Sequence, residues 1–542
     1  MQRSNLILLL IATSLFAAGF VALKDPFFQI RKNFTIFSEV ISEVNELYVV
    51  DIDPERTIRR GINAMLETLD PYTVLIDESR TQEIDIITTG SYAGIGIEVG
   101  ARGGELVIIA PIDGYSAQRK GVRAGDVIVS VNGIPASELS PDDLNAQIRG
   151  QAGTTVELVL RRLGIDEDLV FELERERIEI KNIEWFGFAN EEERIGYILL
   201  TRFTQNSGAD VRRAIQELEE SGELNGLILD LRNNPGGLLI EAVRVADLFL
   251  PEGKDVVRTQ GRASQTRNRY RTENRAIYED RPLVVLQNGG SASSSEIVSG
   301  ALQDHDRAVV MGDGSFGKGL VQIIRPISYG MALKITTSKY FIPSGRYIQT
   351  VDYSGAGSAD EGQVFTTFGG REVFQRNGIE PDIRFDSRPE NMLEVALIRG
   401  NHFFFFANEY AATDNGDMPV YGRDDEALFE AFLAYLDEAD FEYQSRAQRR
   451  FEEFSHQFSE DYGPSSDVDA ELERIRQQLE TKKQREMSES REMILRELYL
   501  ELSTRFDGTN RRQQTAVQID PLVSDAVNLL LDQESYSQIL KP

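Results

Sequence analysis

The 542-residue sequence contains no cysteine, a single tryptophan and only three histidines. Without cysteine, the chain can form no disulfide, no thiolate metal site and no cysteine nucleophile. The histidines, His305, His402 and His456, are separated along the chain, so a histidine-rich metal centre is not expected. No pattern in the sequence implies a cofactor.

Positive charge is also scarce. The chain has 58 lysines and arginines against 88 aspartates and glutamates, a formal net charge of −30. A surface of this sign repels phosphate backbones and anionic lipid, so nucleic acid is not an expected partner. The hydrophobic content of 41% is that of a folded protein. The length predicts three or four domains, and the acidity indicates a solvated or salt-adapted surface.

One uncharged, largely apolar run, residues 6–23, lies between Arg3 and Lys24. Its 18 residues are at the short limit for spanning a bilayer and long for the apolar part of a cleavable signal. The length favours an uncleaved anchor. A signal peptide cleaved near Ala17-Ala18-Gly19 is the alternative. With either, residues 1–24 direct export, and the body is expected on the periplasmic side of the inner membrane in the cell envelope.

Hydrophobic periodicity divides the remaining chain into four regions, and the predicted fold class is multi-domain α+β. Residues 25–85 are predicted to be helical, and 86–180 combine short β-rich runs with two helices in a small barrel. Residues 181–386 alternate strands and helices as an α/β layer, and 387–542 form a charged helical extension.

The region 86–180 contains GIGIEV at Gly94–Val99 and GVRAGDVIVSVNG at Gly121–Gly133. In this order the two motifs resemble a PDZ domain. The resemblance implies that Gly94, Ile95, Gly96 and Ile97 form the peptide-binding loop. Its backbone N–H groups would face a carboxylate, and the next strand would offer an edge to an extended peptide.

Three motif-rich loops, RNNPGG, NGGSASSSE and GSFGKG, each follow a predicted strand of the α/β region. The second crowds four candidate nucleophiles against a helix start: Ser291, Ser293, Ser294 and Ser295. His305 falls near the far end of that helix, roughly 15 Å away, so a Ser-His-Asp triad is poorly supported. Lys318 in GSFGKG is the remaining base if burial lowers its pKa, whereas an exposed turn lysine would have no such role.

Together with LDLRNNPGG and the PDZ-like region, these loops resemble the carboxyl-terminal processing peptidases, the tail-specific serine proteases of family S41, over about residues 36–383. The resemblance implies a crotonase-like protease core, with Ser293 as nucleophile and Lys318 as base. Gln322 and Asp304 match residues important in some members. Gln322 would lie roughly 13 Å from Lys318 in a regular strand, and Asp304 is expected to act as a structural anchor.

The N–H of Ser294, which stands where the family motif has alanine, is predicted to form an oxyanion hole with the N–H of Gly236 or Gly237. The segment Tyr340–Thr350 is expected to line the substrate channel, unless its Arg346 only forms a local salt bridge.

The predicted function is an exported serine endopeptidase that recognises C-terminal tails. A non-catalytic PDZ scaffold on an inactive core is the alternative, and a crotonase-type acyl-thioester site is less favoured because no coenzyme A feature is present. Expected partners are proteins with accessible C-termini, the membrane through the N-terminal segment, and a second copy or an adaptor through the terminal helical regions. The PDZ domain is expected either to occlude the site or to tether substrate.

Overall fold

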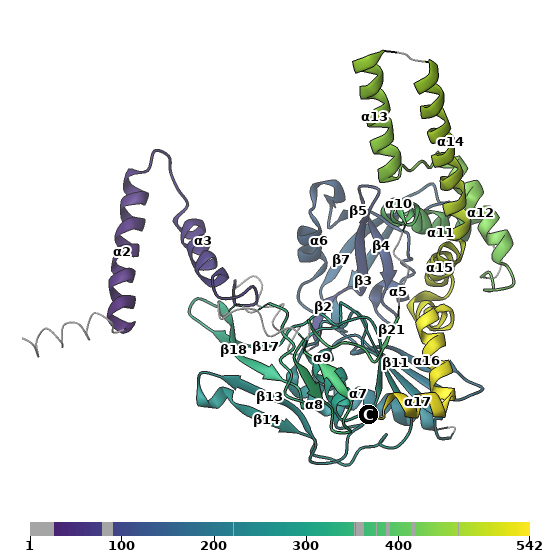
Figure 1. Cartoon of the computed structure of the whole chain (residues 1–542). Helices are drawn as coiled ribbons and strands as arrows, with labels where there is room; N and C mark the ends of the chain where they lie inside the picture. The colour runs from purple at the N-terminus through teal and green to yellow at the C-terminus, as the bar shows by residue number, and fades with distance from the viewer. Residues whose placement is uncertain are drawn as a thin grey trace, which may run out of the picture. The chain divides into compact units, whose positions relative to one another are not determined.

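A computed structural model describes residues 26–77, 90–220, 222–351, 353, 362–375, 377–385, 391–413, 418–463 and 466–542 (Figure 1). These fall into two compact units. The first holds residues 26–77, 322–336 and 353, and the second holds the other described residues.

The first unit begins with helices α2 (Pro26–Leu47) and α3 (Pro54–Glu67). Asp53 starts α3 because its carboxylate accepts the N–H of Arg56. The predicted helical region 25–85 also contains a short strand that the sequence pattern did not reveal, β1 (Val74–Ile76), which pairs antiparallel with residues 332–334 of β18 (Ala332–Phe341). This strand forms because it pairs with a segment that is distant in sequence. A local sequence pattern does not reveal such pairing.

Among the helices that the structure describes, none combines the length and apolar character needed to cross a bilayer. The predicted anchor at residues 6–23 lies outside the described residues.

In the second unit, residues 91–179 form the PDZ-like sheet, in the order β3-β4-β5-β7-β8 with β6 beside β5. Helices α5 and α6 accompany it, and β2 pairs with β9 as a separate ribbon. The elements are β2 (Ser91–Gly94), β3 (Ile97–Arg102), β4 (Glu105–Pro111), α5 (Ser116–Arg119), β5 (Val127–Val131), β6 (Ile134–Pro135), α6 (Pro141–Ile148), β7 (Thr155–Arg161), β8 (Leu169–Glu174) and β9 (Glu176–Glu179).

The α/β region is built on a sheet of order β10-β11-β12-β15-β16-β21, in which only β10 runs antiparallel to its neighbour. Its elements are β10 (Ile183–Asn190), β11 (Ile195–Leu200), α7 (Ser207–Glu219), β12 (Gly226–Asp230), α8 (Leu239–Ala246), β15 (Leu283–Gln287), α9 (Ser294–Asp304), β16 (Val309–Gly312) and β21 (Ile383–Arg384). A second sheet of this region contains β13 (Asp255–Gly261) and β14 (Asn268–Arg271), and it includes residues 338–341 of β18. The strand β17 (Leu320–Pro326) and the ribbon β19 (Val364–Thr366) and β20 (Glu372–Phe374) follow later in the chain.

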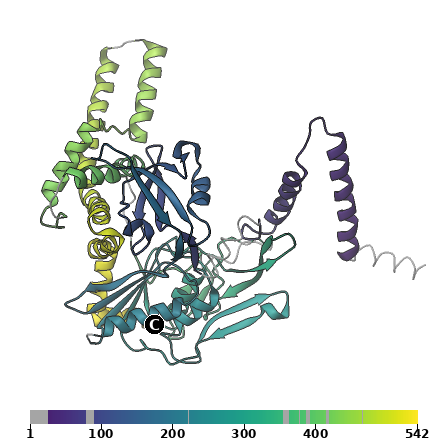
Figure 2. The ribbon, with the colours of Figure 1, turned by 180° about the vertical axis from the view of Figure 1, so that it is seen from behind.

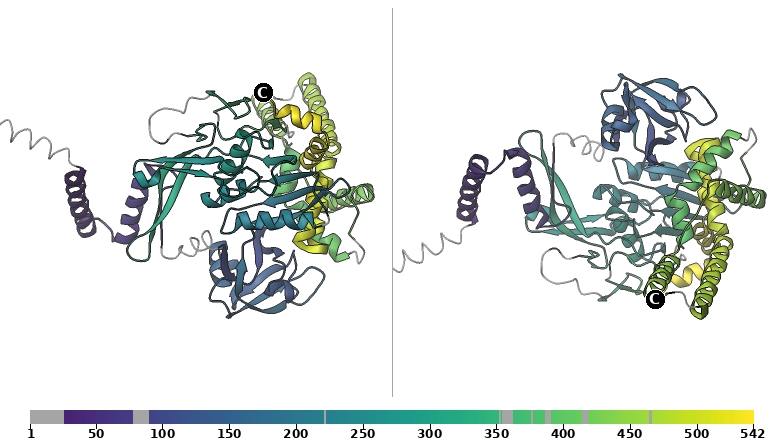
Figure 3. Two further views of the ribbon diagram at one scale, coloured as in Figure 1. Left: turned by 90° about the horizontal axis from the view of Figure 1, so that it is seen from below. Right: turned by 90° about the horizontal axis from the view of Figure 1, so that it is seen from above.

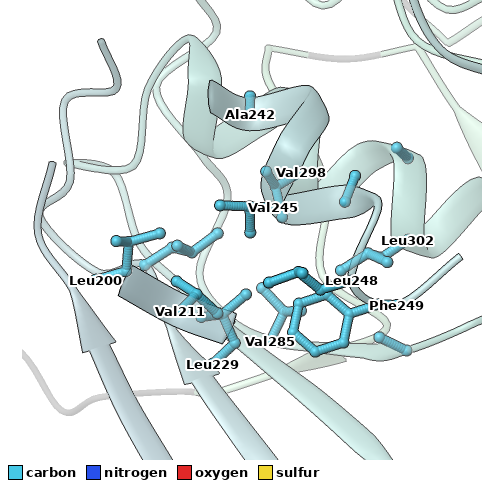
Figure 4. Close-up of a cluster of buried hydrophobic side chains, with 14 of the residues drawn as sticks. Leu200, Val211, Leu229, Ala242, Val245, Leu248, Phe249, Val285, Val298 and Leu302 are labelled. Atoms are coloured by element: carbon cyan, nitrogen blue, oxygen red, sulfur yellow. The ribbon is translucent and has the colours of Figure 1, made fainter. Parts of the chain in front are cut away.

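Helices α7, α8 and α9 cover one face of the main sheet, where Val211, Val245 and Val298 pack against Leu229 and Val285 (Figure 4). The opposite face is covered by α16 (Pro521–Leu531) and α17 (Gln533–Ile539), shown in yellow in Figures 2 and 3. A parallel sheet is stable when both faces are buried, so the end of the charged C-terminal region completes the protease core.

Other C-terminal helices enclose a cluster of their own, which includes Phe403, Phe406 and Phe432. The helices that form this cluster are α10 (Met392–Arg399), α11 (His402–Thr413), α12 (Asp425–Glu438) and α15 (Arg491–Ile519). Helices α13 (Arg446–Tyr462) and α14 (Ser466–Glu489) lie between α12 and α15 in the chain and form a hairpin, of which Met487 of α14 packs against the cluster.

Candidate active site

The four serines of the NGGSASSSE loop differ in environment. The hydroxyls of Ser291, Ser294 and Ser295 donate to the carbonyls of Leu231 (2.8 Å), Gly237 (3.1 Å) and Asn234 (2.8 Å). All three serines are buried, at 1%, 0% and 0% exposure, whereas Ser293 is only partly buried. The three buried hydroxyls therefore hold the loop together, and Ser293 is the one that a substrate can reach.

Ser293 has an unusual backbone conformation, with φ 55° and ψ −108°. Few non-glycine residues adopt positive φ, and such strain is concentrated at functional sites. Ser293 directly precedes α9, so it lies at the end of the helix where unpaired N–H groups and the positive end of the helix dipole favour a developing negative charge.

The carboxylate of Glu296, three residues later, joins the serine loop to the lysine loop. One of its oxygens accepts the N–H of Ser293 at 2.7 Å and the N–H of Lys318 at 3.0 Å. The other accepts the Ser315 hydroxyl at 2.6 Å and the Gly317 N–H at 2.7 Å. Glu296 is fully buried, and burial raises its pKa to about 7 although these four donors favour the charged form.

Tyr340 makes a second connection between the two loops. Its buried hydroxyl lies 3.2 Å from the carbonyl of Ser293 and 2.5 Å from the carbonyl of Lys318. The backbones of Ser293 and Lys318 thus share one carboxylate oxygen and one phenol. Two residues 25 positions apart in sequence are brought together, and Lys318 is partly buried there.

The glycines of RNNPGG lie directly against the serine. A Cβ on Gly236 would stand 2.8 Å from the Ser294 nitrogen, and a Cβ on Gly237 would stand 2.2 Å from the Phe203 carbonyl oxygen. With φ of +90° and +153°, both positions require glycine. The N–H of Gly236 donates to the Asn234 side chain at 2.9 Å, so Gly237 is the better glycine candidate for an oxyanion donor beside Ser294.

Asp304 and His305 lie at the other end of α9. Asp304 is buried and ion-paired with buried Arg346 at 2.5 Å, and it accepts the Ser344 N–H at 2.8 Å. The His305 ring lies 2.7 Å from the Asp255 carbonyl and stacks on Phe368. This geometry favours the anchor role for Asp304 and the local salt bridge for Arg346.

Gln322 belongs to the first compact unit, where its amide donates to the Thr336 hydroxyl at 3.1 Å. That hydroxyl in turn donates to Asp70 at 3.2 Å. Its predicted action on Lys318 stays a prediction.

Several supporting residues were not recognised in the sequence. Arg232, the first residue of the RNNPGG loop, forms an ion pair with buried Asp230 at 2.5 Å, and it also reaches Asp520 at the start of α16 at 2.7 Å. Asp230 accepts the hydroxyl of Tyr197 at 2.6 Å. The LDLR motif and the glutamate of SASSSE were visible signals, but their partners are distant in sequence: Asp520 for Arg232, and the loop Ser315–Lys318 for Glu296.

Known families match most of these regions. The model described as peptidase family S41 matches residues 194–354, that of a PDZ domain matches 107–162, and that of a probable PDZ-protease C-terminal helical domain matches 393–530. A carboxy-terminal-processing protease of Bartonella bacilliformis is 38% identical over 323 residues, which are 59% of this chain and 73% of that protein. The chain belongs to peptidase family S41.

Other relatives of this S41 chain include a probable CtpA-like serine protease of Staphylococcus aureus strain N315, 31% identical over 64% of this chain and 71% of that protein. Among solved structures, the photosystem II D1 C-terminal processing protease is 29% identical, with a TM-score of 0.38, over 69% of this chain and 91% of that one. The fold of an α+β S41 core with a PDZ domain, and a serine-type peptidase activity, follow from family membership.

The PDZ domain of this S41 peptidase presents the predicted peptide loop as a tight turn between β2 and β3. Gly96 has φ +77°, and a Cβ there would stand 2.4 Å from the Tyr115 side chain. The strand that follows, beginning at Ile97, is at the edge of its sheet. Gly94, Ile95, Gly96 and Ile97 therefore lead into a strand edge to which a peptide can add.

Proposed function

We propose that this protein is an exported endopeptidase that recognises the C-terminal tails of its substrates, with Ser293 as nucleophile and Lys318 as general base. The observation that carries the proposal is the pair of bridges, through Glu296 and Tyr340, that holds the strained Ser293 turn against the Lys318 turn.

In the proposed mechanism, the neutral amine of Lys318 takes the hydroxyl proton as Oγ of Ser293 attacks the peptide carbonyl carbon. The negative charge on the carbonyl oxygen is stabilised by the N–H groups of Ser294 and Gly237 at the start of α9. Lysine returns the proton to the leaving amine as the C–N bond breaks. The same lysine then takes a proton from the water that attacks the acyl-enzyme, and it returns this proton to Oγ of Ser293 as the ester bond breaks. Gln322 is proposed to orient the amine.

The PDZ domain is proposed to bind the substrate tail at Gly94–Ile97, which raises the local concentration of the chain to be cut or releases an occluded site. The carboxy-terminal-processing name of the Bartonella relative supports this substrate class. Residues 1–24 are proposed to anchor the protein at the periplasmic face of the inner membrane. Exposed apolar residues of α2, such as Phe27 (80%) and Phe34 (71%), support a further proposal of self-association.

The test compares the wild-type protein with Ser293→Ala, Lys318→Ala and, as a matched serine control, Ser291→Ala. Substrates are an unstructured protein with an apolar C-terminus and the same protein with a charged C-terminus. Complete loss of cleavage in the first two variants, with unchanged circular dichroism, supports the proposal. Cleavage that survives Ser293→Ala would reject Ser293 as nucleophile, and equal cleavage of both tails would reject tail recognition.

A further inference from the structure

The hairpin of α13 and α14 carries an apolar stripe that its own fold leaves open. Phe454, Phe458 and Tyr462 follow one another along α13, with ring centroids 5.9 and 4.9 Å apart. Phe454 is 56% exposed and Tyr462 is 76% exposed. No residue of α13 is buried in the described structure, although the apolar residues of this helix lie on one face.

Between the two helices, packing is thin. Leu472 of α14 is buried, but Ile475 is 38% exposed. The ion pair of Glu452 with Arg476 at 2.9 Å connects the helices near their middle. The ends of α13 and α14 nearest the turn stand clear of the other C-terminal helices in Figures 1 and 2, whereas the base of α14 contacts α15. Two helices alone do not bury this row of aromatic side chains. The exposed rings therefore favour a partner that covers them.

Charge is separated along this hairpin. Residues 456–474, around the turn, contain six carboxylates and one arginine. Residues 446–455 and 475–485, at the base, contain seven basic residues and three carboxylates. Exposed carboxylates around the turn are Glu460, Asp461, Asp467, Asp469, Glu471 and Glu473, and exposed basic residues at the base are Arg446, Arg449, Arg450, Arg476, Lys482 and Arg485.

We propose that this face binds the same hairpin of a second copy, antiparallel, so that four helices form a bundle. A two-fold axis perpendicular to the helices places the acidic turn end of each copy against the positively charged base end of the other. The surface is therefore self-complementary. Phe454 is the central residue of α13, so the axis passes beside it. The aromatic stripes then cover each other, as the inner faces of a four-helix bundle do.

The separated charges allow the proposed antiparallel contact to be tested by reversing the charge at one end of the hairpin at a time. One variant reverses the turn with Glu460→Lys, Asp461→Lys and Glu471→Lys, and another reverses the base with Arg446→Glu, Arg449→Glu and Arg450→Glu. Glu460→Lys and Asp461→Lys at the C-terminal end of α13, and Arg446→Glu and Arg449→Glu at its N-terminal end, each favour the helix dipole, so these four changes are not expected to unfold the helix. A control with the same charge change as the turn variant, in an exposed turn elsewhere, combines Glu191→Lys, Glu192→Lys and Glu193→Lys.

Oligomeric state is measured on the full chain by sedimentation velocity in low salt. Each reversed variant is expected to weaken self-association by at least about tenfold, because like charges then face each other. Mixing the two reversed variants restores it, since the turn of each then matches the base of the other. The control variant associates as the wild type does. A wild-type chain without hairpin-dependent association, or a mixture that fails to recover, overturns the proposal.

Orientation is tested in the cysteine-free chain, where introduced thiols have no competitors. Ala447→Cys and Tyr462→Cys lie on opposite sides of Phe454. Under oxidation, the two variants mixed together form a disulfide in an antiparallel pair, whereas Tyr462→Cys alone does not. Cross-linking of Tyr462→Cys with itself in preference to the mixture would mean a turn-to-turn contact and would overturn the antiparallel arrangement.

Discussion

Replacing Glu296 by glutamine exchanges one carboxylate oxygen for an NH2 group and changes little in size. The carboxylate accepts four hydrogen bonds, two on each oxygen. A glutamine can accept only on its single oxygen, and its NH2 group can only donate. Two of the four donors must therefore face another donor.

The less damaging orientation keeps the amide oxygen toward the N–H groups of Ser293 and Lys318. The NH2 group then faces Ser315 and Gly317. The hydroxyl of Ser315 can rotate and accept, but the N–H of Gly317 cannot, and a buried unpaired N–H costs about 1–3 kcal/mol. If the lysine loop shifts to relieve it, this energy is lost from the transition state, and kcat/KM falls by about 5- to 150-fold.

The assay measures kcat/KM on an unstructured protein substrate, together with the thermal melting of each variant. Glu394→Gln is the matched control, because Glu394 is also a buried glutamate that accepts the N–H before a helix, here from Asn391 at 3.0 Å in α10. We expect Glu394→Gln to keep normal kcat/KM. If Glu296→Gln leaves kcat/KM and melting within error of the wild type, then Glu296 does not hold the two loops together.

Further predictions concern the same loops. Burial raises the pKa of Glu296 to about 7, so between about pH 4.5 and 7 the folded protein keeps a proton that the unfolded chain has lost. Stability should therefore fall by up to about 3 kcal/mol as pH rises through this window, and a melting profile as steep in Glu296→Gln as in the wild type would count against it. Tyr340→Phe removes the hydroxyl between the two carbonyls and should lower kcat about tenfold with a small change in melting; an unaltered kcat would show that this bridge is dispensable. Asp304→Asn should reduce thermal stability strongly, by roughly 3 kcal/mol or more through the unpaired charge of Arg346, while kcat/KM of the folded fraction changes little; the opposite pattern would make Asp304 catalytic. Gly237→Ala should abolish activity because its Cβ would meet the Phe203 carbonyl oxygen at 2.2 Å, and an active Gly237→Ala enzyme would contradict the loop geometry.

Short-range pattern was sufficient for several strands and helices of the α/β region, but it did not predict β10, β13, β14 or β18. The strand Ile195–Leu200 and the helix that begins at Ser207 were both predicted, because their hydrophobic periods of 2 and 3.6 are local properties of the chain. The PDZ and S41 motifs were recognised because glycine-rich turns leave a signature that can be read within a few residues.

Contacts between distant segments were not predictable in this way. Local pattern placed β1 in a helical region, but the strand exists because residues 332–334 pair with it. The charged C-terminal region looked separate from the protease, yet α16 covers the second face of its sheet, and Asp520 pairs with Arg232 of the RNNPGG loop. The sequence supplied the candidate serines and lysine, whereas burial of three serine hydroxyls and the bridges from Glu296 and Tyr340 distinguish Ser293 and bring it to Lys318. Periodicity records which face of an element is buried, but not which other element buries it, because that choice depends on packing of the whole chain.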